Sequence, residues 1–300
     1  MKNTRFIKIF LLIITLIVLP VSVWAFDFGL AANIHAGYGN DKTGENEFDF
    51  KTNFWPRFAF LLGDNAEFLL SLGLTIDINK NELIIPELLR TEYTARFGSA
   101  GLRIGRMNYS DPLSFIASGL FDGVHFNINS RIGKFGAGAW YTGFLYKETA
   151  NITMTDNDQE IYDKPFEYDD FLNTYFAPKR LIAAVEWNHP SLGELLHLNA
   201  AAVFQYDFID KAGQYHNQYI IIKAGLPINS FFLEIGGAVE FSQEKTNSGV
   251  ESNYAFAGDF VFSWMLPAVN SRLAFNFKIA GGTAEDESFT AFNPITTNYF

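Results

Sequence analysis

The stretch LRIGRMNYSDPLSFIASGLFDGV, residues 102–124, holds the residue types of a catalytic or ligand-binding cluster. Arg103 and Arg106 lie three positions apart, and Asp111 and Asp122 flank a short apolar segment. Guanidinium groups bind carboxylates or phosphates through paired hydrogen bonds, and carboxylates serve as general acids or bases. Whether these side chains meet depends on the elements that carry them.

The chain provides no recognisable partners for catalysis. Nucleophilic hydrolysis requires a serine or cysteine next to a histidine that an acid or amide orients. No histidine is spaced to pair with a serine or carboxylate, and the motifs GxSxG and HExxH are absent. The histidines are His35, His125, His189, His197 and His216. We therefore expect no enzymatic activity and no cofactor.

The most acidic segment, TDNDQEIYDKPFEYDDF at residues 155–171, is a second candidate site. Asp156, Asp158 and Glu160 alternate there, and carboxylate oxygens are ligands of Ca²⁺. The segment lacks the central glycine and the final glutamate of a calcium-binding EF-hand loop. It is therefore interpreted as a solvated acidic loop, with calcium binding by these three carboxylates as the alternative.

Composition excludes several classes of protein. The 300 residues include 33 acidic and 22 basic side chains, and the net charge of −11 disfavours nucleic-acid binding. No cysteine is present, which excludes a disulfide framework. Residues 1–25 combine basic residues with an apolar run that ends in VWA, which predicts a signal peptide cleaved after Ala25. A membrane anchor is the alternative, although Pro20 interrupts the short apolar run.

From Phe26 onward, apolar and polar residues alternate with a period of two. In EFLLSLGLTIDIN, residues 67–79, apolar side chains occupy every second position from Phe68 to Ile78. This pattern predicts strands with one apolar and one polar face. Thirteen strands are predicted, near residues 27–39, 47–62, 67–79, 82–97, 101–109, 121–130, 133–147, 177–188, 194–208, 217–226, 231–241, 254–264 and 271–282.

Short and long connections alternate along the chain. Tight turns such as GDNA at 63–66 and GSAG at 98–101 follow every second strand, and most other connections are longer and polar. Most strands run 9–16 residues, long enough to cross a bilayer when tilted. Residues 26–282 thus resemble bacterial outer-membrane β-barrel proteins of the porin-like kind, and the cysteine-free, phenylalanine-rich composition is similar to that of spirochaete porin-like barrels. An exported soluble β-sandwich is the alternative.

The predicted fold is an all-β, antiparallel, up-and-down transmembrane β-barrel that occupies residues 26–300. Single-chain bacterial barrels have an even number of strands, whereas thirteen are predicted here. One interpretation is that residues 289–300 add an irregular fourteenth strand. The other, which we favour, is a barrel of about 14 to 16 strands that is incomplete at its C-terminus.

If the apolar face contacts lipid, the alternate positions face the lumen, where charged side chains avoid the cost of burial in lipid. This parity assigns to the lumen Lys51, Arg57, Asp77, Glu92, Arg96, Arg103, Arg180, Glu186, Asp207, Lys223, Glu234, Glu240, Asp259, Arg272 and Lys278. These charges either tune a diffusion channel or form structural pairs across strands, and pairing is favoured for most of them. Trp55, Trp140 and Phe144 share this parity, either as a sliding surface for sugars or apolar solutes or as a plug.

The predicted strands place residues 102–124 at the outer mouth of the barrel. Asp111 suits the N-cap, Pro112 the first turn and Gly119 the end of a short apolar helix that contains Phe115. We expect this helix to fold inward or against the rim. By parity, Arg106 faces lipid. Two alternatives stay open: a bulge at Gly105 turns it inward as a constriction residue, or the strand has already reached the level of the lipid headgroups.

The favoured function is passive diffusion of small hydrophilic solutes through an outer-membrane channel. The expected partners are outer-membrane lipid and these solutes, and assembly into a homo-oligomer stays open. The competing function is a surface adhesin or receptor barrel that acts through long outer loops at residues 148–176 and after residue 283.

Overall fold

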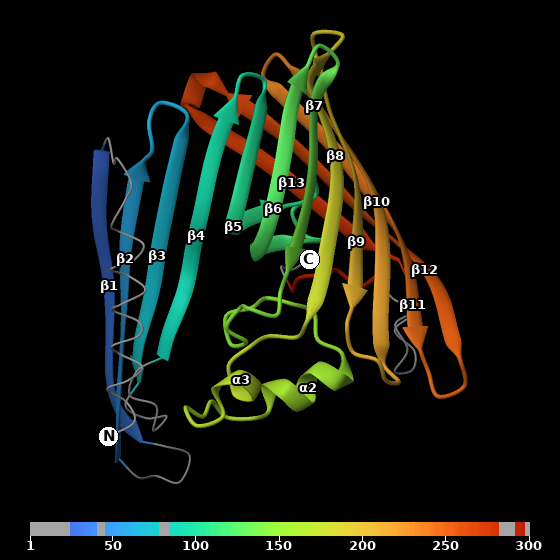
Figure 1. The fold of residues 1–300 in the computed structure, drawn as a ribbon. Helices are drawn as coiled ribbons and strands as arrows, with labels where there is room; N and C mark the ends of the chain where they lie inside the picture. The colour runs from blue at the N-terminus through green and yellow to red at the C-terminus, as the bar shows by residue number, and fades with distance from the viewer. Residues whose placement is uncertain (1–24, 41–45, 78–84, 282–291, 298–300) are drawn as a thin grey trace.

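The computed structural model describes residues 25–40, 46–77, 85–281 and 292–297. Within these ranges, each strand pairs with the next along the chain in a single antiparallel sheet of thirteen strands (Figure 1). The strands are β1 (Ala25–Asn40), β2 (Asn46–Leu61), β3 (Ala66–Asp77), β4 (Ile85–Phe97), β5 (Ala100–Ser110), β6 (Ser118–Ser130), β7 (Gly133–Tyr141), β8 (Arg180–Leu192), β9 (Leu196–Asp207), β10 (Gln214–Ile228), β11 (Phe231–Lys245), β12 (Val250–Leu266) and β13 (Ser271–Ala280). The predicted all-β, up-and-down antiparallel arrangement is confirmed.

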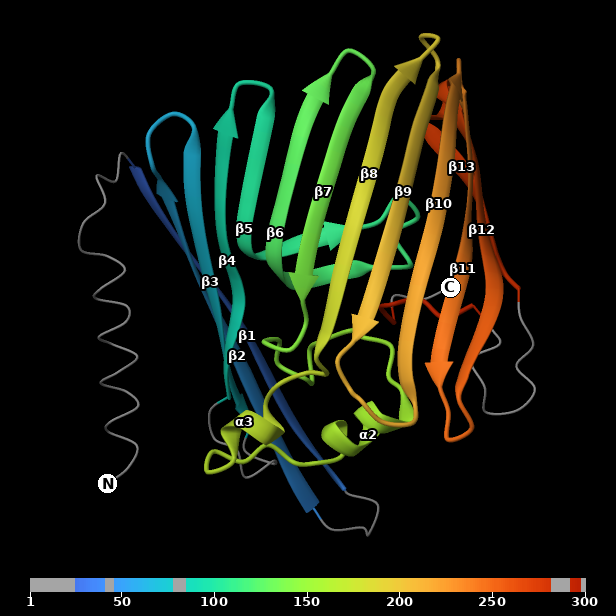
Figure 2. The same ribbon diagram turned by 45° about the vertical axis from the view of Figure 1, so that its right-hand side comes forward.

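The sheet is strongly curved, and its two faces differ (Figure 2). On β10, Ile220 and Ile222 of the convex face are 59% and 55% exposed, whereas Tyr219 and Ile221 of the concave face are 1% and 0% exposed. The convex face stays apolar at the edge of the sheet, where Phe26 packs with a ring-centroid distance of 5.2 Å on Phe60. The period of two therefore separates an apolar outer face from an inner face that holds the buried and polar side chains.

The connections differ between the two ends of the sheet. Tight turns join β2 to β3, β4 to β5, β6 to β7, β8 to β9 and β10 to β11 at one end, and the short 3-10 turn η1 (Pro267–Val269) joins β12 to β13 there. The other end carries residues 142–179, called the long loop below, with α2 (Asp156–Tyr162) and α3 (Phe171–Thr174) (Figure 1). The strand predicted at 133–147 was too long, because β7 stops at Tyr141 where this loop begins. No helix in the described ranges is long and apolar enough to cross a membrane.

β1 and β13 are the edge strands of the described sheet, so the closed barrel predicted from the sequence is not seen in it. Residues 292–297 do not form the irregular fourteenth strand considered above. They run inside the concave face, where Thr296 forms an isolated antiparallel bridge with Ile152. The signal peptide predicted before Ala25 and the remaining residues of 289–300 lie outside the described residues.

β5 and β6 leave the wall of the sheet together and cross its concave side (Figure 2). Gly105 of β5 and Gly123 of β6 lie opposite each other in the strand register. Gly105 has φ +109°, and a Cβ atom there would collide with the carbonyl oxygen of Thr91. A Cβ atom at Gly123 would collide with the carbonyl oxygen of Ala139. Glycine at both positions lets the paired strands turn inward, and residues 106–122 beyond them are called the inner hairpin below.

We expect Gly105→Ala to destabilise the folded protein. Positive φ at a residue with a Cβ atom costs about 1–3 kcal/mol, and the collision with Thr91 adds to it. Urea unfolding of the protein refolded in lipid vesicles measures the change. Gly29→Ala is the matched control, because a Cβ atom at Gly29 meets open space. Equal unfolding midpoints for the two variants would contradict the assignment of the bend.

Candidate functional site

The tip of the inner hairpin is a turn organised by the carboxylate of Asp111. This carboxylate accepts hydrogen bonds from the backbone N–H groups of Leu113, Ser114, Ile116 and Ala117, at 2.7–3.0 Å. Burial raises the pKa of Asp111, and these four donors act in the opposite direction. The short helix predicted here is wrong, because one carboxylate binds amides up to six residues ahead and closes the chain into a turn. Pro112 lies in this turn, and Gly119 lies in β6 opposite Tyr109 rather than at a helix end.

The tip lies inside the curve of the sheet and spans it. Phe115 is 1% exposed and Ile116 is fully buried. The Leu113 side chain lies so close to Gly236 of β11 that a Cβ atom there would collide with it. The ammonium group of Lys278, on β13, lies 4.9 Å from the centroid of the Phe115 ring. Apolar side chains therefore fill much of the space between β6 and β13.

Arg106 points inward and is 3% exposed. Its Nε and Nη2 atoms donate to Asp122 at 3.0 and 2.6 Å, and its guanidinium also donates to the carbonyl oxygens of Leu88 and Phe144. Of the alternatives left open for Arg106, the structure shows the inward one, because the strand bends at Gly105 with φ +109°, immediately before Arg106. The guanidinium holds the two arms of the inner hairpin to each other and to the start of the long loop.

Several of the predicted lumenal charges form pairs across strands. Glu92 lies between Arg90 and Arg103, with oxygen–nitrogen distances of 2.6 and 2.5 Å. Lys223 lies 2.8 Å from Glu234. Among the other predicted residues, Glu186 lies 3.5 Å from His125, and Arg272 donates to Ser263 at 3.2 Å. Arg57 and Arg96 are exposed, Asp259 is buried, and buried Asp207 accepts the Ile209 N–H at 3.0 Å. The side chain of Asp77 lies outside the described residues. The paired charges thus contribute to the wall as structural ladders.

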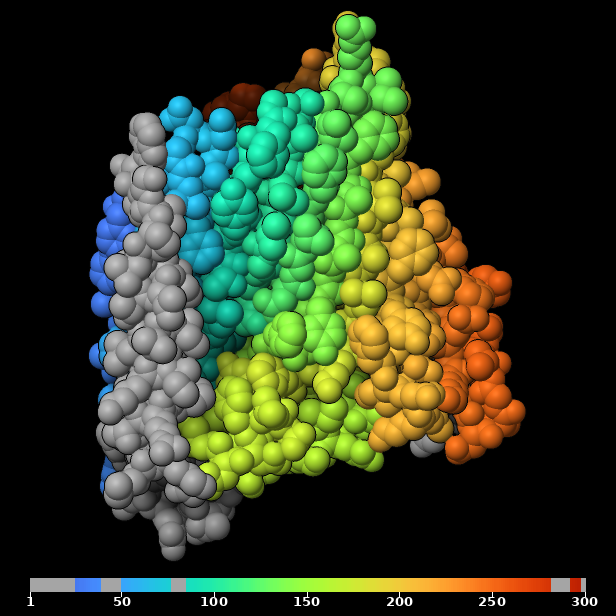
Figure 3. All heavy atoms as spheres, in the orientation of Figure 1, coloured from blue at the N-terminus to red at the C-terminus, as the bar shows by residue number. Residues whose placement is uncertain are grey.

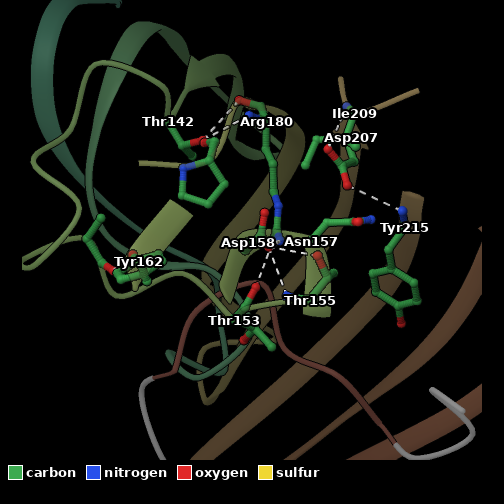
Figure 4. A network of polar contacts seen from close by, with 12 residues as sticks. Thr142, Thr153, Thr155, Asn157, Asp158, Tyr162, Arg180, Asp207, Ile209 and Tyr215 are labelled. Carbon is green, nitrogen blue, oxygen red and sulfur yellow. Dashed lines mark hydrogen bonds and ion pairs between the residues drawn. The ribbon is translucent and has the colours of Figure 1, made fainter. Parts of the chain in front are cut away.

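Arg180 anchors the long loop to the wall of the sheet (Figure 4). It forms a buried ion pair with Asp158 of α2, and its Nη1 atom donates to the Thr153 carbonyl oxygen at 2.7 Å. A second contact joins the long loop to β4, where the Tyr175 hydroxyl donates to the Pro86 carbonyl oxygen at 2.6 Å. In the space-filling view, the yellow-green atoms of the loop form a continuous mass across the lower end of the sheet (Figure 3). Arg180 is therefore a loop anchor rather than a pore-lining residue.

The considered calcium site is not assembled. Asp158 is fully buried against Arg180, whereas Glu160 is exposed and contacts Lys211 at 3.2 Å. Asp156 is exposed in the first turn of α2. The three carboxylates point apart because they lie on the helix α2, where alternate residues point in different directions. Across the described part of the chain, no three metal-ligating side chains gather.

Residues 292–297 bind together the inner hairpin, the long loop and the wall. The Asn293 N–H donates to the Glu240 carboxylate at 2.7 Å, and Ser118 of the hairpin donates its N–H to the Thr296 hydroxyl at 3.1 Å. The Thr153 N–H donates to the Ile295 carbonyl oxygen at 3.0 Å. Glu240, predicted to line the pore, therefore holds this internal segment in place.

A cavity of about 550 Å³ remains between β2–β4 and the inner hairpin. The residues that line it include Lys51, Asn53, Trp55, Thr75, Glu87 and Asn108. Lys51 and Trp55 were expected to face the lumen. Asn53 has the same parity, two residues from each, but its amide is neither a charge nor an aromatic ring, the two signals that mark lumenal positions in the sequence.

The fold is that of bacterial outer-membrane porins. Among solved structures from Pseudomonas aeruginosa, OpdO is 11% identical, with 93% of this chain and 71% of that chain covered and a TM-score of 0.53. OccK2 (OpdF) is 14% identical, with 88% and 67% covered and a TM-score of 0.50. The outer-membrane protein opdK is 12% identical, with 86% and 66% covered and a TM-score of 0.50. The chain spans about two thirds of the length of such proteins, and no family model or curated protein matches its sequence.

We expect Arg180→Met to release the long loop. Removing one partner of a buried ion pair costs about 3–5 kcal/mol, because the other charge stays buried and unpaired. Limited trypsin digestion should then cleave the loop after Lys147, which is fully buried in the anchored loop, or after Lys179 much faster than in the unsubstituted protein. Arg272→Met, at an exposed position, is the control. Identical loop cleavage in both variants would contradict the anchoring role.

We expect Glu240→Ala to detach residues 292–297 from the wall. The chain contains no cysteine, so Ile295→Cys introduces a single thiol at a fully buried position. Loss of the carboxylate acceptor should speed labelling of this thiol by a maleimide roughly tenfold. Ser248→Cys, in an exposed turn, should label quickly in both backgrounds. An unchanged rate at position 295 counts against the proposed attachment.

Proposed function

We propose that this protein is an outer-membrane channel for passive diffusion of small hydrophilic solutes. The observation that carries the proposal is the cavity of about 550 Å³, lined by both polar and apolar side chains, on the concave side of a sheet whose convex face is apolar. An apolar outer face suits lipid, and polar groups inside avoid it. The porin-like fold supports the same function.

In this proposal, residues 26–300 belong to a membrane barrel, preceded by a signal peptide at residues 1–25. Unpaired strand edges are not tolerated in lipid, so the edges of β1 and β13 must be paired in the membrane. Additional strands that bring the total to about 14 to 16 would close the barrel. Assembly of several such barrels into a homo-oligomer is compatible with this arrangement.

The proposed route runs beside the inner hairpin rather than through the centre of the sheet. Apolar packing of Leu113 and Phe115 fills the region toward β11 and β13. The space along β2–β4 stays open and is lined by side chains such as Lys51 and Thr75. The charge pairs elsewhere on the wall support the barrel, and the lining of this passage selects the solute.

The direct test is electrical. The protein reconstituted into planar bilayers should produce stepwise single-channel currents in a salt solution. Complete absence of conductance from correctly folded protein would contradict the channel proposal.

Shortening the tip should widen the channel. We expect replacement of residues 112–117 by a Gly-Ser link to raise single-channel conductance at least about twofold, because conductance follows the open cross-section. The control replaces Arg131 and Ile132 by Gly-Ser. These residues form the tight turn between β6 and β7, and this change should leave conductance unchanged. A conductance that is unaffected by shortening the tip would place the constriction elsewhere.

A surface adhesin or receptor is the second candidate function. The favouring observation is the ordered long loop, which presents Leu172 and Tyr168 with exposed fractions of 77% and 58%. Exposed apolar side chains on an anchored loop suit contact with another macromolecule. A non-conducting protein would favour this candidate.

A further inference from the structure

We propose that the cavity beside the inner hairpin is a binding site for a neutral, polyhydroxylated solute of one or two sugar rings. The inference rests on the proposed channel function and specifies its substrate class. A volume of about 550 Å³ falls in the range of small-molecule sites. In the proposed channel, the solute passes this cavity between β2–β4 and the inner hairpin.

The lining offers hydrogen-bonding groups that suit hydroxyls. Three asparagines, Asn53, Asn108 and Asn151, are among the residues that line the cavity. The Asn53 Oδ1 atom accepts from the Thr75 hydroxyl at 2.7 Å, which leaves its NH₂ group as a donor. Within the described residues, the side-chain amides of Asn108 and Asn151 have no hydrogen-bond partner. An amide both donates and accepts, and so does a sugar hydroxyl.

The lining also offers an apolar surface of the right kind. Trp55 of β2 lines the cavity, as do Leu88 and Leu89 of β4. The C–H faces of a pyranose ring are apolar, and a flat indole buries them at low entropic cost. A combination of one large aromatic ring with several amides therefore fits a sugar better than an inorganic ion.

The charges around the cavity are largely committed to the protein. Arg106 is used by Asp122 and by two carbonyl oxygens. The Glu87 carboxylate accepts from the Thr149 hydroxyl. Lys51 is exposed and forms no ion pair within the described residues, but Glu87 and Glu148 lie in the same lining and oppose an anion. The site therefore favours a neutral solute.

The test measures how maltose changes the current through the reconstituted protein. Maltose should reduce the current saturably, whereas glucuronate and glucosamine at equal concentration should have smaller effects. Trp55→Ala should raise the half-blocking concentration of maltose about tenfold, as expected for the loss of one aromatic contact. Trp55→Phe should retain most of the block. Trp264→Ala, on the convex face, should leave it unchanged.

The outcomes separate this inference from the channel proposal. Normal conductance without any block by maltose, or a stronger block by glucuronate or glucosamine, overturns the inference and leaves the channel intact. If the protein does not conduct, the channel proposal fails. Calorimetric titration of the detergent-solubilised protein with maltose then decides the inference: heat that depends on Trp55 supports the site, and no heat of binding overturns it.

Discussion

Gly105 and Gly123 lie opposite each other on β5 and β6, and neither position has room for a Cβ atom. Because both strands can bend at the same level, they leave the wall as a pair and keep their mutual hydrogen bonds. The inward direction of Arg106, the burial of the tip and the position of the remaining cavity all follow from this bend. A wide curved sheet cannot be filled by the side chains of its own wall, and the inner hairpin provides the additional mass.

Buried charges hold the internal elements to one another. Arg106 joins the arms of the inner hairpin, Arg180 binds the long loop through Asp158, and Glu240 binds residues 292–297. Each charge satisfies backbone groups that would otherwise be buried without partners, as the bonds from Arg106 to two carbonyl oxygens show. Arg103 and Arg106 resemble a catalytic or selective cluster in the sequence, but they form ion pairs with Glu92 and Asp122 that are structural. In the proposed channel, selectivity is consequently left to the less conspicuous amides that line the cavity.

The sequence contains enough information to predict the sheet, because strand period and turn length are local properties. The alternation around Phe68 and the tight turns at every second connection lead to the up-and-down order that the structure shows. Features that depend on distant contacts were left open or missed. The direction of Arg106 was left open because it changes with the φ angle of one glycine, and the partner of Arg180 was missed because it lies in a loop helix. The Asp111 carboxylate replaces the expected helix by a turn, an outcome that residue preferences alone do not distinguish.

The central claim is that solutes pass between β2–β4 and the inner hairpin, and cysteine modification tests it most directly. Single cysteines at Asn53 and Thr75 face the passage, whereas cysteines at Ala238 and Ala257 lie behind the packed tip. A charged thiosulfonate reagent is added while current flows through the reconstituted channel. We expect the current to fall for Asn53→Cys and Thr75→Cys and to stay constant for Ala238→Cys and Ala257→Cys. A fall in current at positions 238 and 257, with none at 53 and 75, would contradict it.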